Sequence, residues 1–294
     1  MPPFGRVLTA MASPMHADGA LDLDGAQRLA VHLLEHGNDG VVVAGTTGES
    51  PTLSHAETLD LFRAVVQAVD GHGAVLAGTG KNDTAETVAL TREAAALGVD
   101  GILSVTGYYN RPSQRGLDAH FRAVAAATEL PVMLYNIQSR TNNEIAPATL
   151  LSLIEGVDNI VGVKDAMADL SKTAWLAARL PDDAAIWSGD DATALATLAV
   201  GGYGIVSVAG HLVGDDIARM IDVFGTDPGK AREIHLRLHE LFTALFLDAS
   251  PGPLKAALAL AGLPAGPVRL PLVGADDDVV AAVRAAMVGA GVLS

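Results

Sequence analysis

The 294-residue chain contains no cysteine, few aromatic residues and few basic ones. Without cysteine it can form neither a disulfide nor a thiolate metal site, so any catalytic nucleophile must be a different group. Only 19 lysines and arginines stand against 34 aspartates and glutamates, which gives a net charge of −15. Because this charge repels phosphates and anionic lipid headgroups, we expect no nucleic-acid partner and no membrane partner.

Long apolar runs are also missing, since no stretch approaches the roughly 18 consecutive apolar residues of a membrane helix. Residues 1–6 lack the basic segment followed by an apolar one that a secretion signal would show. These absences predict a cytoplasmic protein. Hydrophobic residues make up 50% of the chain, which predicts a large buried core.

Short apolar runs bounded by glycine or turn residues recur along the first two thirds of the chain. They are apolar throughout rather than alternating, which is typical of parallel strands covered on both faces. The eight runs are Arg6–Thr9, Gly40–Ala44, Ala74–Ala77, Gly101–Val105, Pro131–Tyr135, Ile160–Lys164, Ala185–Ser188 and Gly204–Val208.

Helical patterns, with apolar residues three and four positions apart, lie between these runs. Examples are residues 24–35, 56–69, 84–97 and 117–128. Ser54 and Asp83 occupy N-cap positions. Gly37, Gly71 and Gly98 stand where glycine commonly ends a helix. Eight alternations of strand and helix predict an α/β fold, an eight-stranded parallel (β/α)8 TIM barrel, although periodicity alone also allows a doubly wound open sheet.

Only helical patterns follow Gly225, near residues 228–247, 253–261 and 276–289. We therefore predict a catalytic barrel domain of residues 1–225 and a C-terminal helical extension of residues 226–294. No low-complexity linker separates the two parts, so the extension is expected to pack on the barrel.

Lys164 is the most specific candidate for a catalytic residue. In such a barrel the active site lies where the strands end, and Lys164 ends the run that begins at Ile160. Burial there would disfavour the ammonium form and free the amine to attack a ketone. The alternative is a lysine that turns outward to solvent or pairs with a carboxylate.

Polar residues follow other runs as well. The Gly45–Glu49 segment offers two hydroxyls and closely spaced backbone N–H groups, which can bind a carboxylate or can simply satisfy a turn. Tyr109 and Tyr135 can relay protons through their phenols, or lie as amphipathic residues at a barrel rim.

His235 and His239 stand four residues apart in a helical pattern. Leu236 and Leu238 beside them favour solvated histidines over metal ligands, so we expect no metal. No glycine-rich segment has the spacing of a dinucleotide-binding or phosphate-binding loop.

Six motifs occur in a fixed order along the chain. They are Gly45–Glu49, Tyr108–Asn110, Tyr135–Asn136, Ser139–Thr141, Gly162–Asp165 and Ser188–Asp191. Together they resemble the dihydrodipicolinate synthase and N-acetylneuraminate lyase family, over residues 5–208 and loosely into the tail. The resemblance implies a pyruvate-dependent class I aldolase that needs no cofactor, because a lysine forms a covalent imine with pyruvate.

Within the family, Thr46 and Arg140 resemble the members that condense pyruvate with L-aspartate 4-semialdehyde to 4-hydroxy-tetrahydrodipicolinate, in lysine and diaminopimelate biosynthesis. The sialic-acid lyases usually have serine in place of Thr46. Arg140 matches the arginine that receives the semialdehyde carboxylate, a task suited to a guanidinium fork. Two alternatives stay open: a related lyase acting on a sugar acid or a 4-hydroxy-2-oxo acid, and a catalytically silent barrel that binds a keto acid.

The resemblance also assigns the pyruvate pocket. Lys164 is the imine-forming amine, and Thr47 is a ligand of the pyruvate carboxylate. Gly189 and Val206 line the pocket with backbone groups and a small apolar side chain.

Thr46, Tyr135 and Tyr109 match the proton-relay trio of the family. Tyr109 crosses a tight dimer interface in that family, so the resemblance implies a shared site. It further implies a homotetramer built as a dimer of dimers.

His55, Asn82, Glu86 and Tyr108 match a family site that binds lysine as an inhibitor, but Thr58 stands where sensitive members have a second histidine. Whether lysine inhibits this chain stays open.

Three departures from the family pattern affect loops. Gly107 and Gln138 stand where the family commonly has proline, so the loops carrying Tyr108 and Arg140 are expected to be less constrained. Ser250–Pro253 replaces the usual Asn-Pro-x-Pro segment.

Overall fold

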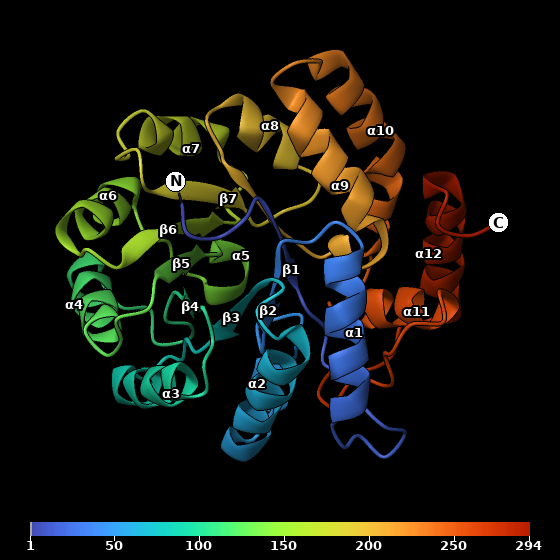
Figure 1. Cartoon of the computed structure of the whole chain (residues 1–294), viewed down its shortest axis with the longest axis horizontal. Helices are drawn as coiled ribbons and strands as arrows, with labels where there is room; N and C mark the ends of the chain where they lie inside the picture. The colour runs from blue at the N-terminus through green and yellow to red at the C-terminus, as the bar shows by residue number, and fades with distance from the viewer. Residues whose placement is uncertain (1) are drawn as a thin grey trace.

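Figure 1 shows the computed structural model, which describes residues 2–294. Its parallel strands form a closed barrel in sequence order, and β1 pairs with β8 to complete the ring. The strands are β1 (Val7–Ala10), β2 (Gly40–Val43), β3 (Ala74–Gly78), β4 (Gly101–Val105), β5 (Val132–Asn136), β6 (Ile160–Asp165), β7 (Ala185–Ser188) and β8 (Gly204–Ser207). This confirms the predicted TIM barrel and excludes the open sheet, because an open sheet has no pairing between its first and last strands.

Helices follow the strands and surround the barrel in Figure 1. They are α1 (Leu23–Glu35), a 3₁₀ turn η1 (Ser50–Thr52), α2 (His55–Val69), α3 (Thr84–Ala96), α4 (Gln114–Ala125), α5 (Gln138–Thr141), α6 (Pro147–Gly156), α7 (Leu170–Ala177), α8 (Ala194–Ala199) and α9 (Gly210–Phe224). Beyond them lie α10 (Pro228–Ala244), α11 (Gly252–Leu260) and α12 (Asp277–Ala290).

The helix starts are set by capping side chains. Ser54 accepts a hydrogen bond from the Glu57 backbone, and the Glu57 carboxylate accepts one from the Ser54 backbone at 2.8 Å, which forms a capping box. Asp83 caps α3 in the predicted position. Helix α4 begins three residues before the predicted Leu117, because Ser113 caps a first turn that carries no apolar periodicity.

Two apolar layers hold the barrel together. Residues on alternate strand positions point either inward or toward the helices, so the strands are buried on both faces and read as continuous apolar runs. Trp187 lies inside the barrel, where its indole N–H donates to the Gly5 carbonyl at 2.9 Å, and Phe4 and Tyr203 pack against its ring. These aromatic side chains fill the amino-terminal end of the barrel.

The C-terminal helices pack onto one another and onto the barrel layer. Helix α10 packs against α9 and α12, and α12 against α11. The Met15 backbone N–H donates to the Ala265 carbonyl at 3.0 Å, which ties the segment after α11 to the start of the chain. The division at residue 225 stays a prediction.

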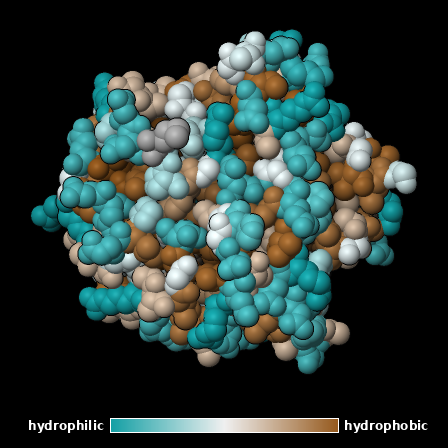
Figure 2. Space-filling model, in the orientation of Figure 1, coloured by the Kyte–Doolittle hydropathy of each residue, from teal (hydrophilic) through white to brown (hydrophobic). Residues whose placement is uncertain are grey.

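Figure 2 shows hydrophilic residues over most of the viewed face, with apolar side chains exposed around α12. Within residues 2–294 no helix has the length and hydrophobicity needed to cross a bilayer.

Candidate active site

Lys164 lies at the end of β6 and points into the barrel, with 4% of its surface exposed. Its Nζ atom is 4.4 Å from the centre of the Tyr135 ring, on the neighbouring strand. Burial lowers the pKa of Lys164 to about 8, although the charge of Asp191 acts in the opposite direction. The outward-turned alternative for this lysine therefore does not apply, and the amine is available near neutral pH.

Tyr135 is buried and lies beside Thr46. Burial raises the pKa of Tyr135 to about 12, while the charge of Arg140 and a hydrogen bond with Thr46 act to lower it. A cavity of about 30 Å³ borders both side chains and is also lined by Gly45, Leu103 and Val105. The phenol therefore stays protonated at neutral pH and can donate a proton into this space.

The Gly45–Glu49 loop joins β2 to η1. The Ser13 hydroxyl donates to the Gly48 carbonyl at 2.7 Å, and the Thr52 hydroxyl donates to the Glu49 carbonyl at 3.0 Å. Other residues thus supply side-chain hydrogen bonds to the loop backbone, while Thr46 bonds to Tyr135. Thr47 is buried next to it.

Asp191 links the carboxyl ends of β7 and β8 through hydrogen bonds, a role that the sequence did not indicate. Its carboxylate accepts hydrogen bonds from the Ser207 hydroxyl and from the Val208 and Ala209 backbone N–H groups, both at 3.0 Å. Burial raises its pKa. The motif Ser188–Asp191 marked the residue, but its partners lie 16 to 18 positions away and meet it only through the pairing of β7 with β8.

Gly189 directly follows β7, and Val206 lies on β8. The Gly189 backbone N–H donates to the Asp165 carbonyl at 2.7 Å, and a Cβ at this position would lie 2.7 Å from the Cβ of Ala166. Only glycine therefore allows this close approach. Val206 is buried in the barrel interior together with Tyr135.

Arg140 and Tyr109 have different surroundings. Arg140 lies on the short helix α5, where we expected a loop, and its charge lowers the pKa of both Lys164 and Tyr135. Tyr109 is 91% exposed in the single chain and has a left-handed backbone with φ 69°. The structure thus gathers Lys164, Tyr135, Thr46 and Arg140, whereas Tyr109 extends into solvent.

The residues matched to a lysine site also gather on one side of the molecule. A groove of about 300 Å³ is lined by His55, Thr58, Lys81, Glu86, Ala89 and Leu90. The Nε2 atom of His55 lies within hydrogen-bonding distance of the Glu93 carboxylate, at 2.7 Å. Burial and the charge of Glu86 raise the pKa of Tyr108, and a backbone hydrogen bond from Asn82 acts to lower it.

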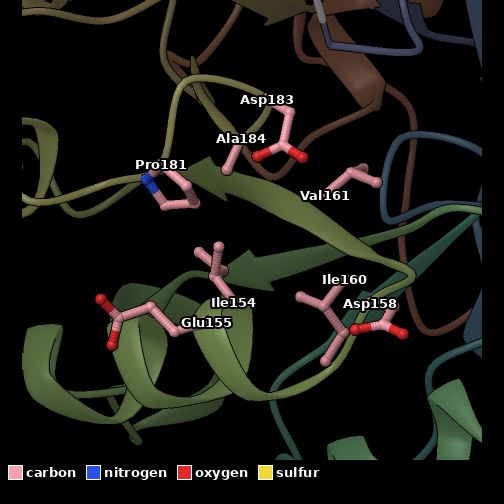
Figure 3. A pocket seen from close by; sticks show the side chains of 8 residues that line it. All are labelled: Ile154, Glu155, Asp158, Ile160, Val161, Pro181, Asp183 and Ala184. Atoms are coloured by element: carbon pink, nitrogen blue, oxygen red, sulfur yellow. The ribbon is translucent and has the colours of Figure 1, made fainter.

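A larger pocket, of about 440 Å³, lies elsewhere and is shown in Figure 3. Its lining comes from the end of α6, the start of β6 and the segment before β7. The residues are Ile154, Glu155, Asp158, Ile160, Val161, Pro181, Asp183 and Ala184. This is the amino-terminal end of the strands, away from Lys164, and TIM barrels perform chemistry at the other end.

His235 departs from the solvated state expected from the sequence. It is buried, and its ring centre lies 5.6 Å from that of Phe242 and 5.9 Å from that of His239. Leu236, the next residue, is exposed. The helix therefore presents His235 to the core and Leu236 to solvent. Within residues 2–294 no three His, Cys, Asp or Glu side chains are grouped to hold a metal ion.

Comparison with known proteins adds independent findings. The sequence profile of the dihydrodipicolinate synthetase family matches residues 3–289. The chain is 53% identical over 291 residues to the 4-hydroxy-tetrahydrodipicolinate synthase of Moorella thermoacetica, with 99% of each chain covered. It is 52% identical over 294 residues to the synthase of Symbiobacterium thermophilum, with 100% of each covered. The crystal structure of DHDPS from Cyanidioschyzon merolae with lysine bound superposes with a TM-score of 0.98 at 46% identity, covering both chains completely.

Proposed function

Because the chain belongs to the dihydrodipicolinate synthetase family, we propose that it is a lyase that condenses pyruvate with L-aspartate 4-semialdehyde. The product is 4-hydroxy-tetrahydrodipicolinate, an intermediate of lysine and diaminopimelate biosynthesis. One observation carries the mechanism: the buried Lys164 amine, with its pKa lowered to about 8, lies over the Tyr135 ring at the carboxyl end of the barrel.

Imine formation is the first step of the proposed reaction. The unprotonated Lys164 amine attacks C2 of pyruvate, and the resulting carbinolamine loses water to give a C=N bond. The leaving hydroxyl needs a proton. Tyr135 can supply it, since its pKa of about 12 keeps the phenol protonated and Thr46 can return the proton through their hydrogen bond.

Carbon–carbon bond formation follows. Loss of a proton from C3 converts the imine to an enamine, whose C3 attacks the aldehyde carbon of the second substrate while the aldehyde oxygen takes up a proton. The amino group of that substrate then attacks the imine carbon, which closes the ring and releases Lys164 as the free amine. Arg140 at the mouth carries the charge that would bind the semialdehyde carboxylate.

The remaining candidates define the space around pyruvate. Thr47 would hold the carboxylate with its hydroxyl and neighbouring N–H groups. The absence of a side chain at Gly189 and the small apolar side chain of Val206 leave room for the methyl end of the substrate.

Assembly completes the proposed site. Tyr109 is 91% exposed in the single chain, which suits a residue that enters the site of a second subunit. We propose a tight dimer in which Tyr109 joins Thr46 and Tyr135 of the partner protomer, with two such dimers forming a tetramer. We also propose the groove beside His55 and Glu86 as the place to test for lysine inhibition.

Borohydride trapping tests the imine. Reduction of the protein with pyruvate should add one pyruvate-derived group at Lys164, as read by peptide mass spectrometry. Lys164→Arg should abolish the adduct, because a guanidinium does not form an imine. Lys172→Arg is the matched control, since Lys172 is half-exposed and ion-paired with Glu144 at 2.9 Å. An adduct at another lysine, or none, would contradict the proposal.

A substrate panel tests the acceptor. Turnover with aspartate semialdehyde and little cleavage of sugar acids or 4-hydroxy-2-oxo acids is the expected result. The reverse preference would indicate a related lyase. Trapping of pyruvate without turnover of any aldehyde would indicate a silent barrel.

A further inference from the structure

A buried ion pair joins the loop that carries Thr46 and Thr47 to the C-terminal helices. Glu49 ends this loop, and its carboxylate lies 2.6 Å from the Nζ atom of Lys255 on α11. The two side chains are 0% and 3% exposed. The side chains contact one another rather than the reacting groups, while the Glu49 backbone N–H donates to the Thr46 carbonyl at 3.0 Å.

Both members of the pair have further partners in the segment after α11. The Lys255 ammonium donates to the Pro267 carbonyl at 2.7 Å. The other Glu49 oxygen accepts a hydrogen bond from the Arg269 backbone N–H at 2.8 Å. The Arg269 side chain in turn donates to the carbonyls of Gly19 and Thr52, each at 2.8 Å. Each oxygen of the Glu49 carboxylate is thus held by a residue of the C-terminal extension, one by Lys255 and the other by Arg269.

The loop backbone shows why such an anchor matters. Ala44, which precedes the loop, and Glu49, its last residue, both have left-handed backbone conformations, with φ 53° and 56°. Such conformations are unfavourable for residues with a side chain and persist where the surrounding structure imposes them. Gly48 is packed so closely that a Cβ would lie 3.1 Å from the Met11 carbonyl oxygen. The loop is therefore held by Met11, just after β1, and by Lys255 and Arg269 from the C-terminal part of the chain.

Burial of the pair is poorly explained by stability. Removing two charges from water costs about as much as their attraction returns, and apolar residues of similar size often serve as well. Breaking such a pair by removing one partner is different, because it leaves the other charge buried and uncompensated. A buried ion pair next to a substrate-binding loop therefore suits a positional role.

We infer that Glu49 and Lys255 are positioning residues, through which the C-terminal helices hold the hydroxyls of Thr46 and Thr47 in place for pyruvate. This inference rests on the proposed function. It predicts that a change on α11, far along the chain from the mouth, alters the handling of pyruvate.

Lys255→Met is the decisive variant, since it leaves the loop sequence intact and keeps a side chain of similar length. The unpaired Glu49 carboxylate should shift toward solvent and carry the loop with it. We expect the KM for pyruvate to rise by about tenfold or more in protein that is folded by circular dichroism. Adding Glu49→Gln should return KM to within about threefold of wild type, because the amide has no charge to leave buried and can still accept from Arg269.

Glu57→Gln is the matched control. It breaks the ion pair between Glu57 and the Arg269 side chain, which also joins the barrel to the C-terminal segment, and it changes neither Glu49 nor the Arg269 backbone N–H that donates to it. It should lower the thermal midpoint while leaving KM and kcat within about twofold of wild type.

Three results would overturn the inference. They are kinetic constants of folded Lys255→Met within about twofold of wild type, a loss of kcat with unchanged KM, and no recovery in the double variant. If Lys255→Met does not fold, Glu49→Gln alone decides, with a rise in KM of about threefold expected and an unchanged KM counting against the inference. Borohydride trapping in wild type separates this from the proposed function, because failure there would remove the premise itself.

Discussion

Tyr135 and Lys164 are register partners on β5 and β6, and the Lys164 amine lies 4.4 Å from the centre of the Tyr135 ring. An aromatic face attracts a cation, so the ring favours the charged lysine. Burial nevertheless lowers the pKa of Lys164 to about 8, and the charge of Asp191 only partly opposes this effect. Near pH 7 roughly a tenth of the amine is then unprotonated, against less than about a thousandth for an exposed lysine.

The rate of imine formation should follow this ionisation. A lowered pKa places the free amine above about pH 8, so the rate at limiting pyruvate should rise about tenfold per pH unit below that point and level off above it. Quenching with borohydride at timed intervals, followed by mass spectrometry, measures the rate. A midpoint near the ordinary lysine value would show that burial does not activate the amine.

Arg140→Ala should separate the two substrates. Loss of the guanidinium should raise the KM for aspartate semialdehyde by about tenfold or more, with a much smaller change for pyruvate. The Arg140 charge lowers the pKa of Lys164, so its removal should also move the pH midpoint of imine formation upward. Steady-state kinetics across pH test both effects.

Arg179→Ala is the control for that experiment, since Arg179 stacks on Trp175 at 4.2 Å on the outside of the barrel. It should leave both KM values near those of wild type. Equal changes for both substrates in Arg140→Ala would argue against a role in semialdehyde binding.

Tyr109 allows a complementation test of the proposed dimer. Tyr109→Phe and Lys164→Ala should each be nearly inactive. A hybrid of the two has one site with Lys164 from one protomer and Tyr109 from the other, so co-refolded mixtures should regain activity. Hybrids can be identified by a mass tag on one variant. Confirmed hybrids without activity, or a fully active dilute monomer, would show that each protomer works alone.

The ion pair of Glu57 with Arg269 should make stability fall in acid. The Arg269 guanidinium holds the pKa of Glu57 at about 2, below its ordinary value of 4.5. A lowered folded-state pKa gives stability that is present above pH 4.5 and is lost as the pH falls toward 2. Because Glu57 is partly exposed, we expect only about 1 kcal/mol from it.

Glu57→Gln should therefore lower the thermal midpoint at pH 7 by about 2–4 °C. The difference from wild type should shrink as the pH falls below 4.5, since the wild-type carboxylate then becomes protonated. Calorimetry at several pH values tests this, and a difference that does not depend on pH would assign the effect to packing instead.

The order of strands and helices could be read from the sequence because it depends on local pattern. All eight strands lie within one residue of their predicted bounds at each end, since buried parallel strands are apolar throughout. The start of α4 was missed because a cap, rather than apolar spacing, sets it. The strand end allowed Lys164 to be either buried or turned outward, and only the structure decides that it is buried.

Other features depended on the closed barrel. Asp191 reaches the Ser207 hydroxyl only because β7 pairs with β8, and Tyr135 meets Lys164 only because β5 pairs with β6. His235 turned inward although its neighbours suggested otherwise, because the rotation of a helix about its axis is set by what packs against it.

The sequence by itself determined which elements form, in which order, and which residue types follow each strand, since periodicity and capping act over a few neighbouring residues. The tertiary structure decided which of those residues have their charges changed or paired. Glu49 and Arg269 lie 220 positions apart, and their hydrogen bond exists only once the C-terminal helices pack on the barrel. The pKa of Lys164 likewise depends on water being excluded by strands from the whole ring, which no local pattern encodes.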